Sequence, residues 1–256
     1  MRILLTNDDG IHAPGLVALE KIAHALTDDV WVVAPELDQS GLSHSLSLND
    51  PLRLRHVGEK KFAVRGTPSD CVIMGLRRIL ADGKPDLVLS GVNSGTNIAD
   101  DVTYSGTIAG AIEGTMLGIP SIALSQGYPL GERARIPYET SVEHGPRVVR
   151  SLIDFGFPDN ILYNVNFPNR TPDKVEGVRI ATQGRMAHGL HAEERFDGRG
   201  NQYFWLAYRK NEGGAVPPGS DIEAVSAGFI SVTALRLDLT AHDLAEPLRH
   251  HFARRG

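Results

Sequence analysis

Short apolar runs that alternate with segments of helical periodicity constrain the fold of this chain more than any other feature. Residues 2–6 form the first run, and residues 30–34 form the second. Between them, apolar side chains from Leu16 to Leu26 recur at helical spacing. A strand, a helix and a second strand within about thirty residues make one βαβ unit. We therefore expect a parallel sheet with helices packed on its faces.

The same alternation continues to about residue 172. Residues 51–64 are an exception, because short runs on either side of Gly58 are typical of a hairpin. The pattern favours an α/β fold with a mostly parallel sheet. Further strands are expected at residues 87–90, 120–125 and 162–167, and further helices at residues 67–80, 108–117 and 138–155.

Beyond residue 172 the pattern changes to polar, aromatic and strand-like segments. We expect one domain, residues 1–256, with a core of about residues 1–172 and a β-rich extension of about residues 173–256 that serves as an arm or an oligomer contact. The segments of this extension are a polar, irregular stretch at 184–200, an aromatic stretch at 203–206, a strand at 229–237 and a short basic helix at 244–255.

Composition excludes several classes of protein. Lysine and arginine number 26, and aspartate and glutamate 31, with no basic block, so a stable nucleic-acid partner is not expected. The single cysteine, Cys71, excludes a disulfide framework and fits a reducing compartment. No run approaches the ~18 apolar residues of a membrane span, and acidic residues interrupt the first twenty positions, unlike a signal peptide. We expect a cytoplasmic protein with no membrane partner.

Oxygen-bearing side chains follow several of the predicted strands. Asp8 and Asp9 follow the first strand, Ser40 lies after the second, and Asn93 follows the strand at residues 87–90. The carboxyl ends of parallel strands meet where such sheets bind ligands. Two adjacent carboxylates repel each other, and this oxygen-only set suits magnesium, manganese or calcium better than structural zinc. The alternative is that the two acids only shape a turn or cap the next helix.

Ser105, Gly106 and Thr107 suggest a phosphate-binding turn. They open a helix rich in small residues, where free backbone N–H groups and two hydroxyls come together. A divalent cation beside a helix start indicates phosphate chemistry. The alternative here is an ordinary capped helix of the core.

The sequence resembles the SurE family, because it contains five motifs of that family in the same order. Residues 164–168 and 228–233 also match later blocks of the family, so the resemblance covers the whole chain. The five motifs are residues 2–15, Asp38-Gln39-Ser40-Gly41, Gly66-Thr67-Pro68-Ser69-Asp70-Cys71, residues 90–97 and Tyr104-Ser105-Gly106-Thr107.

The resemblance implies an activity, a fold and a site. Members of the family are stationary-phase survival proteins that act as metal-dependent nucleoside monophosphate phosphatases. Their fold is a Rossmann-like core with a C-terminal β-rich extension used in oligomerisation, which implies a homodimer or homotetramer. By the same resemblance, Asp8, Asp9, Ser40 and Asn93 hold one divalent cation per subunit, Mg²⁺ or Mn²⁺, and Asn97, Ser105, Gly106 and Thr107 contact the substrate phosphate.

The expected reaction is hydrolysis of 5'-nucleotides, with 3'-nucleotides and polyphosphate as candidate further substrates. We expect in-line attack by a metal-activated water, with Asp8 and Asp9 as the catalytic carboxylates and Asp9 as the acceptor of the water's proton. His12 and His44 lie near the motifs and are rival candidates for the general acid.

Two other classes of protein stay open at this stage. A phosphatase with a covalent aspartyl-phosphate also places acids after its first strand, but those acids are usually one residue apart, on the same side of the strand, whereas Asp8 and Asp9 are adjacent. A non-catalytic nucleotide-binding module needs the same sheet and phosphate turn without any chemistry.

Overall fold

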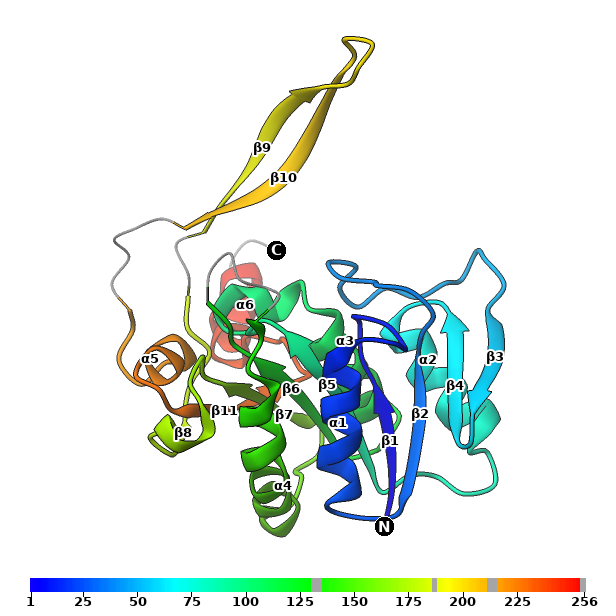
Figure 1. The fold of residues 1–256 in the computed structure, drawn as a ribbon. Coiled ribbons are helices and arrows are strands. Elements are labelled where there is room, and N and C mark those ends of the chain that lie inside the picture. The colour runs from blue at the N-terminus through cyan, green and yellow to red at the C-terminus, as the bar shows by residue number, and fades with distance from the viewer. Residues whose placement is uncertain (130–134, 186–187, 211–215, 254–256) are drawn as a thin grey trace.

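One large sheet forms the centre of the molecule, in a computed structural model that describes residues 1–129, 135–185, 188–210 and 216–253. Within these residues, the strands of this sheet are β1 (Arg2–Thr6), β2 (Asp29–Pro35), β3 (Arg53–Gly58), β4 (Lys61–Arg65), β5 (Leu87–Ser94), β6 (Ser121–Gln126), β7 (Ile161–Phe167), β8 (Val178–Ile180) and β11 (Ile230–Arg236). Their order across the sheet is β3-β4-β2-β1-β5-β6-β7-β11-β8 (Figure 1). Neighbours run parallel, except β3 with β4 and β7 with β11.

The order of the parallel strands explains where a ligand site is expected. With β3 set aside, the strands from β4 to β7 follow the order 3-2-1-4-5-6 of a Rossmann sheet. From β1 the chain therefore adds β2 and β4 on one side of the sheet, and then β5, β6 and β7 on the other side. This reversal opens a crevice at the carboxyl ends of β1 and β5. The predicted α/β, Rossmann-like fold is confirmed.

Helices cover both faces of the sheet. The apolar side chains of β1 point alternately to the two faces, and Ile3, Leu4 and Leu5 are all fully buried. Ile3 and Leu5 pack with the first and fourth helices, while Leu4 packs with the second. None of the described helices is both long and apolar enough to cross a lipid bilayer. The α-helices are α1 (Pro14–His24), α2 (Pro68–Met74), α3 (Gly106–Met116), α4 (Tyr138–Phe155), α5 (Asp221–Ser226) and α6 (His242–Ala253).

The helix predicted at residues 67–80 begins as the sequence indicates but does not stay α-helical. Thr67 and Asp70 form a reciprocal capping box, with Asp70 N donating to Thr67 Oγ1 and Thr67 N donating to Asp70 Oδ2. After α2 the backbone continues as a π-helical segment, Gly75–Ile79. Cys71 is fully buried and its burial raises the pKa of the thiol, as is typical of a structural cysteine. Short 3-10 helices occur at Ala99–Thr103 and Pro172–Lys174.

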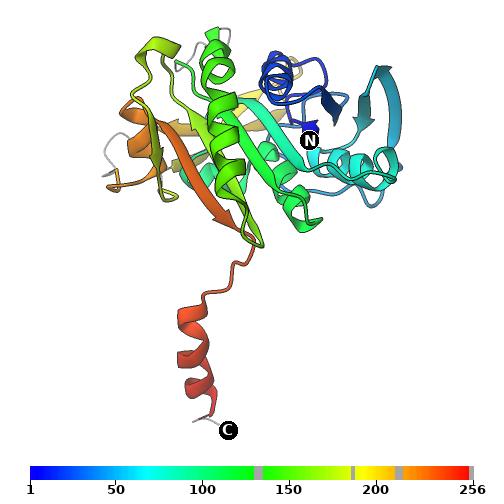
Figure 2. The ribbon, with the colours of Figure 1, turned by 90° about the horizontal axis from the view of Figure 1, so that it is seen from below.

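The segment after residue 172 contributes both to the main sheet and to two projecting elements. Strands β8 and β11 complete the main sheet, whereas β9 (His188–Phe196) and β10 (Gln202–Lys210) pair only with each other, as an antiparallel arm that stands away from the body (Figure 1). Helix α6 also projects from the body, as Figure 2 shows, and none of its residues is buried. The last two residues of the predicted helical tail, 254 and 255, lie outside the described residues.

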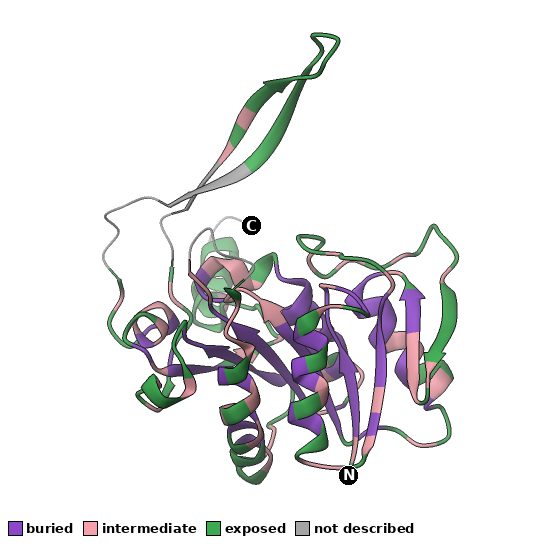
Figure 3. Ribbon diagram, in the orientation of Figure 1, coloured by how far each residue is buried: buried purple, intermediate pink, exposed green. Residues whose placement is uncertain are grey.

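One expectation for this segment is wrong. Residues 184–200 were expected to be irregular, but most of the described part of this stretch is strand β9. The physical reason is that none of the residues of β9 whose burial the structure describes is buried. Figure 3 shows the described part of the arm as mostly exposed, in contrast to the buried central strands. Without a buried face, a strand needs no alternation of apolar and polar residues, so its sequence carries no period-two signal.

Candidate active site

The acidic turn that carries Asp8 and Asp9 follows β1 at the reversal of strand order. Asn7 stabilises the turn, since its side-chain amide donates to the carbonyl of Gly10 at 2.9 Å. The backbone carbonyl of Asp8 accepts a hydrogen bond from Gln39 N at 2.8 Å. The turn is thereby joined to the loop that follows β2, which is the loop that carries Ser40.

Asp8 is a buried carboxylate that lies close to two other acids, Asp9 and Asp38. Its side chain is directed at α3, where the Thr107 hydroxyl donates to Asp8 Oδ1 at 2.5 Å. Burial raises the pKa of Asp8 to about 6, and the negative charges of Asp9 and Asp38 add to this increase, while the bond from Thr107 opposes it. A cation placed between these acids would remove much of the cost of holding them together.

Asp9 is held from the opposite side, by the end of β5. Its Oδ2 accepts from the backbone N of Ser94 at 3.1 Å and from Ser94 Oγ at 3.2 Å. The Ser94 hydroxyl also lies 2.8 Å from the hydroxyl of Tyr138, the first residue of α4. The neighbouring residue, Asn93, donates its side-chain amide to the carbonyl of Gly95, which leaves the amide oxygen as an available ligand atom.

Ser40 lies on the exposed loop after β2. Its backbone N and its Oγ both donate to Asp38 Oδ1, at 2.8 and 2.6 Å. A hydroxyl that donates to a carboxylate keeps its oxygen lone pairs for a cation. Asp38 was not selected from the sequence as a site residue, yet it orients Ser40 and adds to the field at Asp8. Its signal was its place in the same motif, two residues before Ser40.

The turn Ser105-Gly106-Thr107 lies directly against Asp8. Ser105 Oγ accepts from Ile108 N at 3.0 Å, so this side chain is the N-cap of α3. Gly106 is in such close contact that a Cβ there would lie 2.8 Å from Asp8 Cβ. The two hydroxyls of the turn are therefore engaged within the protein. The free backbone N–H groups of the first turn of α3 are the donors that this turn offers to a phosphate.

Asn97 lies in a buried polar network rather than on an open surface. Its side-chain amide donates to Ser125 Oγ at 2.8 Å, its backbone N donates to Asn166 Oδ1, and its carbonyl accepts from Asn164. A role of Asn97 as a phosphate contact stays a prediction. The sequence reading missed Asn164 and Asn166 as its supports. Their signal was two asparagines at positions i and i+2 of an otherwise apolar strand, which places both on one face.

The two histidines that are candidates for the general acid differ in their surroundings. His44 Nε2 lies 3.0 Å from Oε2 of Glu113, a buried residue of α3, and so ties the loop after β2 to that helix. His12 is exposed at the start of α1. Both assignments as a general acid stay predictions.

The donor set at this edge of the sheet fits a hard divalent cation. It consists of two carboxylates, a hydroxyl and an amide oxygen, from the acidic turn, the loop after β2 and the end of β5, which hydrogen bonds join to one another. Within the described residues, no three histidine, cysteine, aspartate or glutamate side chains gather as a metal-binding group. Any cation here therefore depends on hydroxyl and amide oxygens beside the two acids, as magnesium, manganese and calcium sites often do.

Comparisons with known proteins identify relatives of this chain. A family model described as "Survival protein SurE" matches residues 3–189. A protein of Methylorubrum extorquens (strain PA1) named "5'-nucleotidase SurE" is 63% identical over 94% of each chain. One of the same name from Rhodopseudomonas palustris (strain BisA53) is 59% identical over 99% of this chain and 100% of its own. The crystal structure of the Sure protein from Aquifex aeolicus superposes with a TM-score of 0.85 at 38% identity, covering 98% of this chain and 99% of that one.

Proposed function

The chain belongs to the SurE family, and on this premise we propose that it is a metal-dependent phosphomonoesterase that hydrolyses nucleoside monophosphates to nucleoside and phosphate. One observation carries the proposal: the buried carboxylate of Asp8 lies beside a second acid and against the start of α3. Paired acids would repel a phosphate unless a cation lay between them. The relatives named 5'-nucleotidase support the choice of substrate.

We place one divalent cation per subunit, Mg²⁺ or Mn²⁺, at the acidic turn. The side chains that would hold it differ in how they are fixed, but each offers an oxygen. When bound, the cation supplies Lewis-acid activation of the phosphoryl group and of the attacking water. The proposed ligands are Asp8, Asp9, Ser40 and Asn93.

The chain's own residues orient the reacting groups. Thr107 fixes the carboxylate of Asp8, and Ser94 fixes that of Asp9 through two hydrogen bonds. Asp9 accepts the proton of the attacking water as its oxygen forms the new bond to phosphorus. The bond from phosphorus to the nucleoside oxygen breaks on the opposite side, and this oxygen takes up a proton, for which His12 and His44 are the candidate donors. The backbone N–H groups that open α3 donate to the phosphoryl oxygens, together with Asn97 and the Ser105-Gly106-Thr107 turn, and stabilise the charge that develops there.

Several narrower assignments accompany this proposal. We include 3'-nucleotides and polyphosphate as further substrates, because a site that holds mainly the phosphoryl group does not by itself select one leaving group. The cytoplasmic location, inferred from the single cysteine, stays a prediction.

We further propose that chains associate into a homodimer or homotetramer through the arm and α6. The arm exposes Phe204, Trp205 and Leu206, and α6 exposes Leu248 and Phe252. Apolar side chains gathered on projecting elements are typical of contact surfaces. Light scattering at micromolar concentrations is expected to give at least twice the mass of one chain, 27.7 kDa. A monomer at all concentrations would refute this assignment.

Phosphate release by chelator-stripped protein tests the proposed activity. Nucleoside 5'- and 3'-monophosphates are supplied with and without added Mg²⁺ or Mn²⁺, beside Asp9→Asn. Turnover is expected only with metal, and the variant is expected to lose about 10²-fold or more, since it lacks the proton acceptor. Turnover that ignores metal and Asp9 would refute the site. A trapped aspartyl-phosphate would favour the covalent phosphatase, and nucleotide binding without turnover would favour the non-catalytic module.

A further inference from the structure

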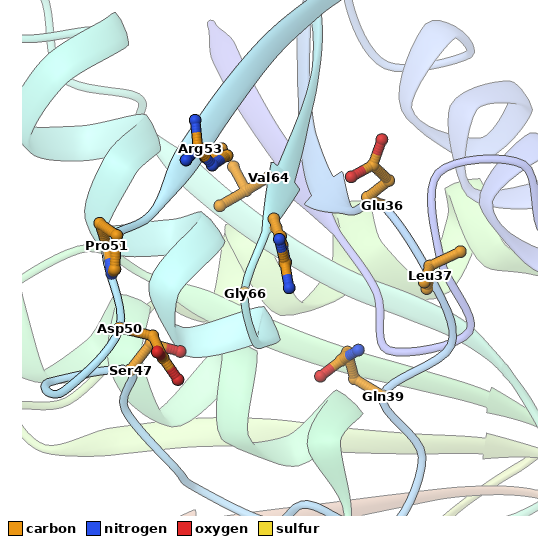
Figure 4. Close-up of a pocket in the computed structure, with 10 residues that line it drawn as sticks. Glu36, Leu37, Gln39, Ser47, Asp50, Pro51, Arg53, Val64 and Gly66 are labelled. Carbon is orange, nitrogen blue, oxygen red and sulfur yellow. The ribbon is translucent and has the colours of Figure 1, made fainter.

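An open cavity of about 600 Å³ lies beside the acidic turn. Figure 4 shows its two walls: Leu37 and Gln39, from the loop after β2, lie on one side, and Ser47 and Pro51, which precede β3, lie on the other. Gly66, just beyond the end of β4, lies between them. Pockets for small organic ligands commonly have volumes in this range.

This cavity is connected to the proposed metal site through Gln39. Gln39 lines the cavity, and its backbone N donates to the carbonyl of Asp8 at 2.8 Å. The next residue is Ser40, one of the proposed metal ligands. A substrate whose phosphate is held at the acidic turn can therefore extend its remaining part past Gln39 into the cavity.

Two arginines of the β3–β4 hairpin provide the cavity with hydrogen-bond donors. Arg53 and Arg65 both line it and are direct partners across the antiparallel pair. Like charges directly opposite each other are destabilising. Nevertheless, neither guanidinium has an ion pair or side-chain hydrogen bond within the part of the chain that the structure describes. By contrast, Arg55, two residues further along β3, pairs with Glu36 at 2.6 Å.

The rest of the lining indicates which part of a nucleotide these donors would contact. Leu37 and Pro51 add exposed apolar surface, which a phosphate group alone would not use. A base offers both an apolar face and an edge of acceptor atoms. Guanidinium groups stack on such faces and donate in pairs to the N7 and O6 atoms of guanine.

We propose that this cavity binds the base of the nucleotide substrate, and that Arg53 and Arg65 determine a preference for guanine. The inference rests on the proposed function, since it assumes that the phosphate of the same molecule lies at the acidic turn. Arg53 and Arg65 contact the edge of the base, and Leu37 and Pro51 contact its face. The hairpin thus selects the substrate, while the acidic turn carries out the chemistry.

The test compares a substrate that has a base with one that has none. The values of kcat/KM for guanosine 5'-monophosphate and for ribose 5-phosphate are measured for the wild type, Arg53→Gln and Arg65→Gln. In each variant, kcat/KM is expected to fall about tenfold more for the guanine nucleotide than for ribose 5-phosphate, because one pair of hydrogen bonds to the base is lost. Most of this fall is expected to come from a higher KM. Arg77→Gln is the matched control, since Arg77 is exposed and does not line the cavity.

Equal losses on both substrates, or no loss on either, would overturn the assignment. If adenosine 5'-monophosphate, measured beside them, loses as much kcat/KM as the guanine nucleotide does, the preference for guanine is overturned. Calorimetry with guanosine, which carries no phosphate, separates this inference from the proposed function. If the protein hydrolyses nothing but binds guanosine, and Arg65→Gln abolishes that binding, the base site stands and the activity falls. If wild-type protein hydrolyses nucleotides but binds guanosine no better than Arg65→Gln does, the proposed activity stands and the base site is refuted.

Discussion

Asp8→Asn is expected to abolish phosphatase turnover while making the metal-free protein more stable. Asparagine has the same shape and keeps an oxygen for the Thr107 hydroxyl, but it removes a charge that is buried beside Asp9 and Asp38. Because the pKa of Asp8 is raised from 3.8 to about 6, the ionised form opposes folding at pH 7. We expect the free energy of unfolding in urea to rise by about 1–3 kcal/mol, and turnover to fall by about 10²-fold or more.

The dependence on pH follows from the sign of this shift. Below the unfolded value of 3.8 the carboxyl is protonated in both states, so the gain should shrink as the pH falls from 6 towards 3.8. Asp154→Asn is the control, because Asp154 is exposed on α4 and its substitution should change stability by less than about 0.5 kcal/mol. A metal-free Asp8→Asn protein that is less stable than the wild type, or that keeps its turnover, would contradict this account of the site.

Among the substitutions proposed for this protein, Gly15→Ala is expected to cause the largest loss of stability. Gly15 lies in the first turn of α1, and a Cβ there would lie 1.9 Å from the carbonyl oxygen of Val92 in β5. Helix propensity alone would favour alanine by roughly 1 kcal/mol, so the two effects have opposite signs. The clash is with backbone, which cannot rotate away. We expect the free energy of unfolding to fall by about 3 kcal/mol and activity to fall with it, because Asn93 and Ser94 follow Val92.

Gly198→Ala is the control for this substitution, because a Cβ at that position meets no atom within 4 Å. Urea unfolding followed by circular dichroism measures both variants. A Gly15→Ala protein as stable as the wild type would show that α1 does not pack on the end of β5 as closely as described. Phosphate release from the folded fraction tells whether β5 has shifted at the site.

Most of the core could be predicted from the sequence because its strands are buried on both faces. The run that becomes β1 is mainly apolar, and helical periodicity identifies α1 and α4. The arm could not be predicted in the same way, since β9 buries none of its residues from 191 to 196. The position of β11 between β7 and β8 also has no local signal, because it depends on which strand edge remains open after the parallel strands have paired.

The candidate site was also only partly predictable from the sequence. Asp8, Asp9, Ser40 and Asn93 could be selected from the sequence because polar residues after buried strands converge at one edge of a parallel sheet. The contacts that fix these side chains could not be predicted. Thr107 and Asp8 are 99 residues apart in the chain, and Ser94 and Asp9 are 85 apart. Such contacts depend on how helices and strands pack in three dimensions, and a local pattern of residues does not predict that packing.

Binding of Mn²⁺ to chelator-stripped protein tests the central claim most directly, because it examines the site without relying on turnover. The signal of free Mn²⁺ in electron paramagnetic resonance is followed as the ion is titrated into the wild type and into Asp9→Asn. The account predicts one ion bound per chain of the wild type, and binding weakened at least tenfold in the variant. Equal binding by the two proteins, or no binding by the wild type, would contradict it.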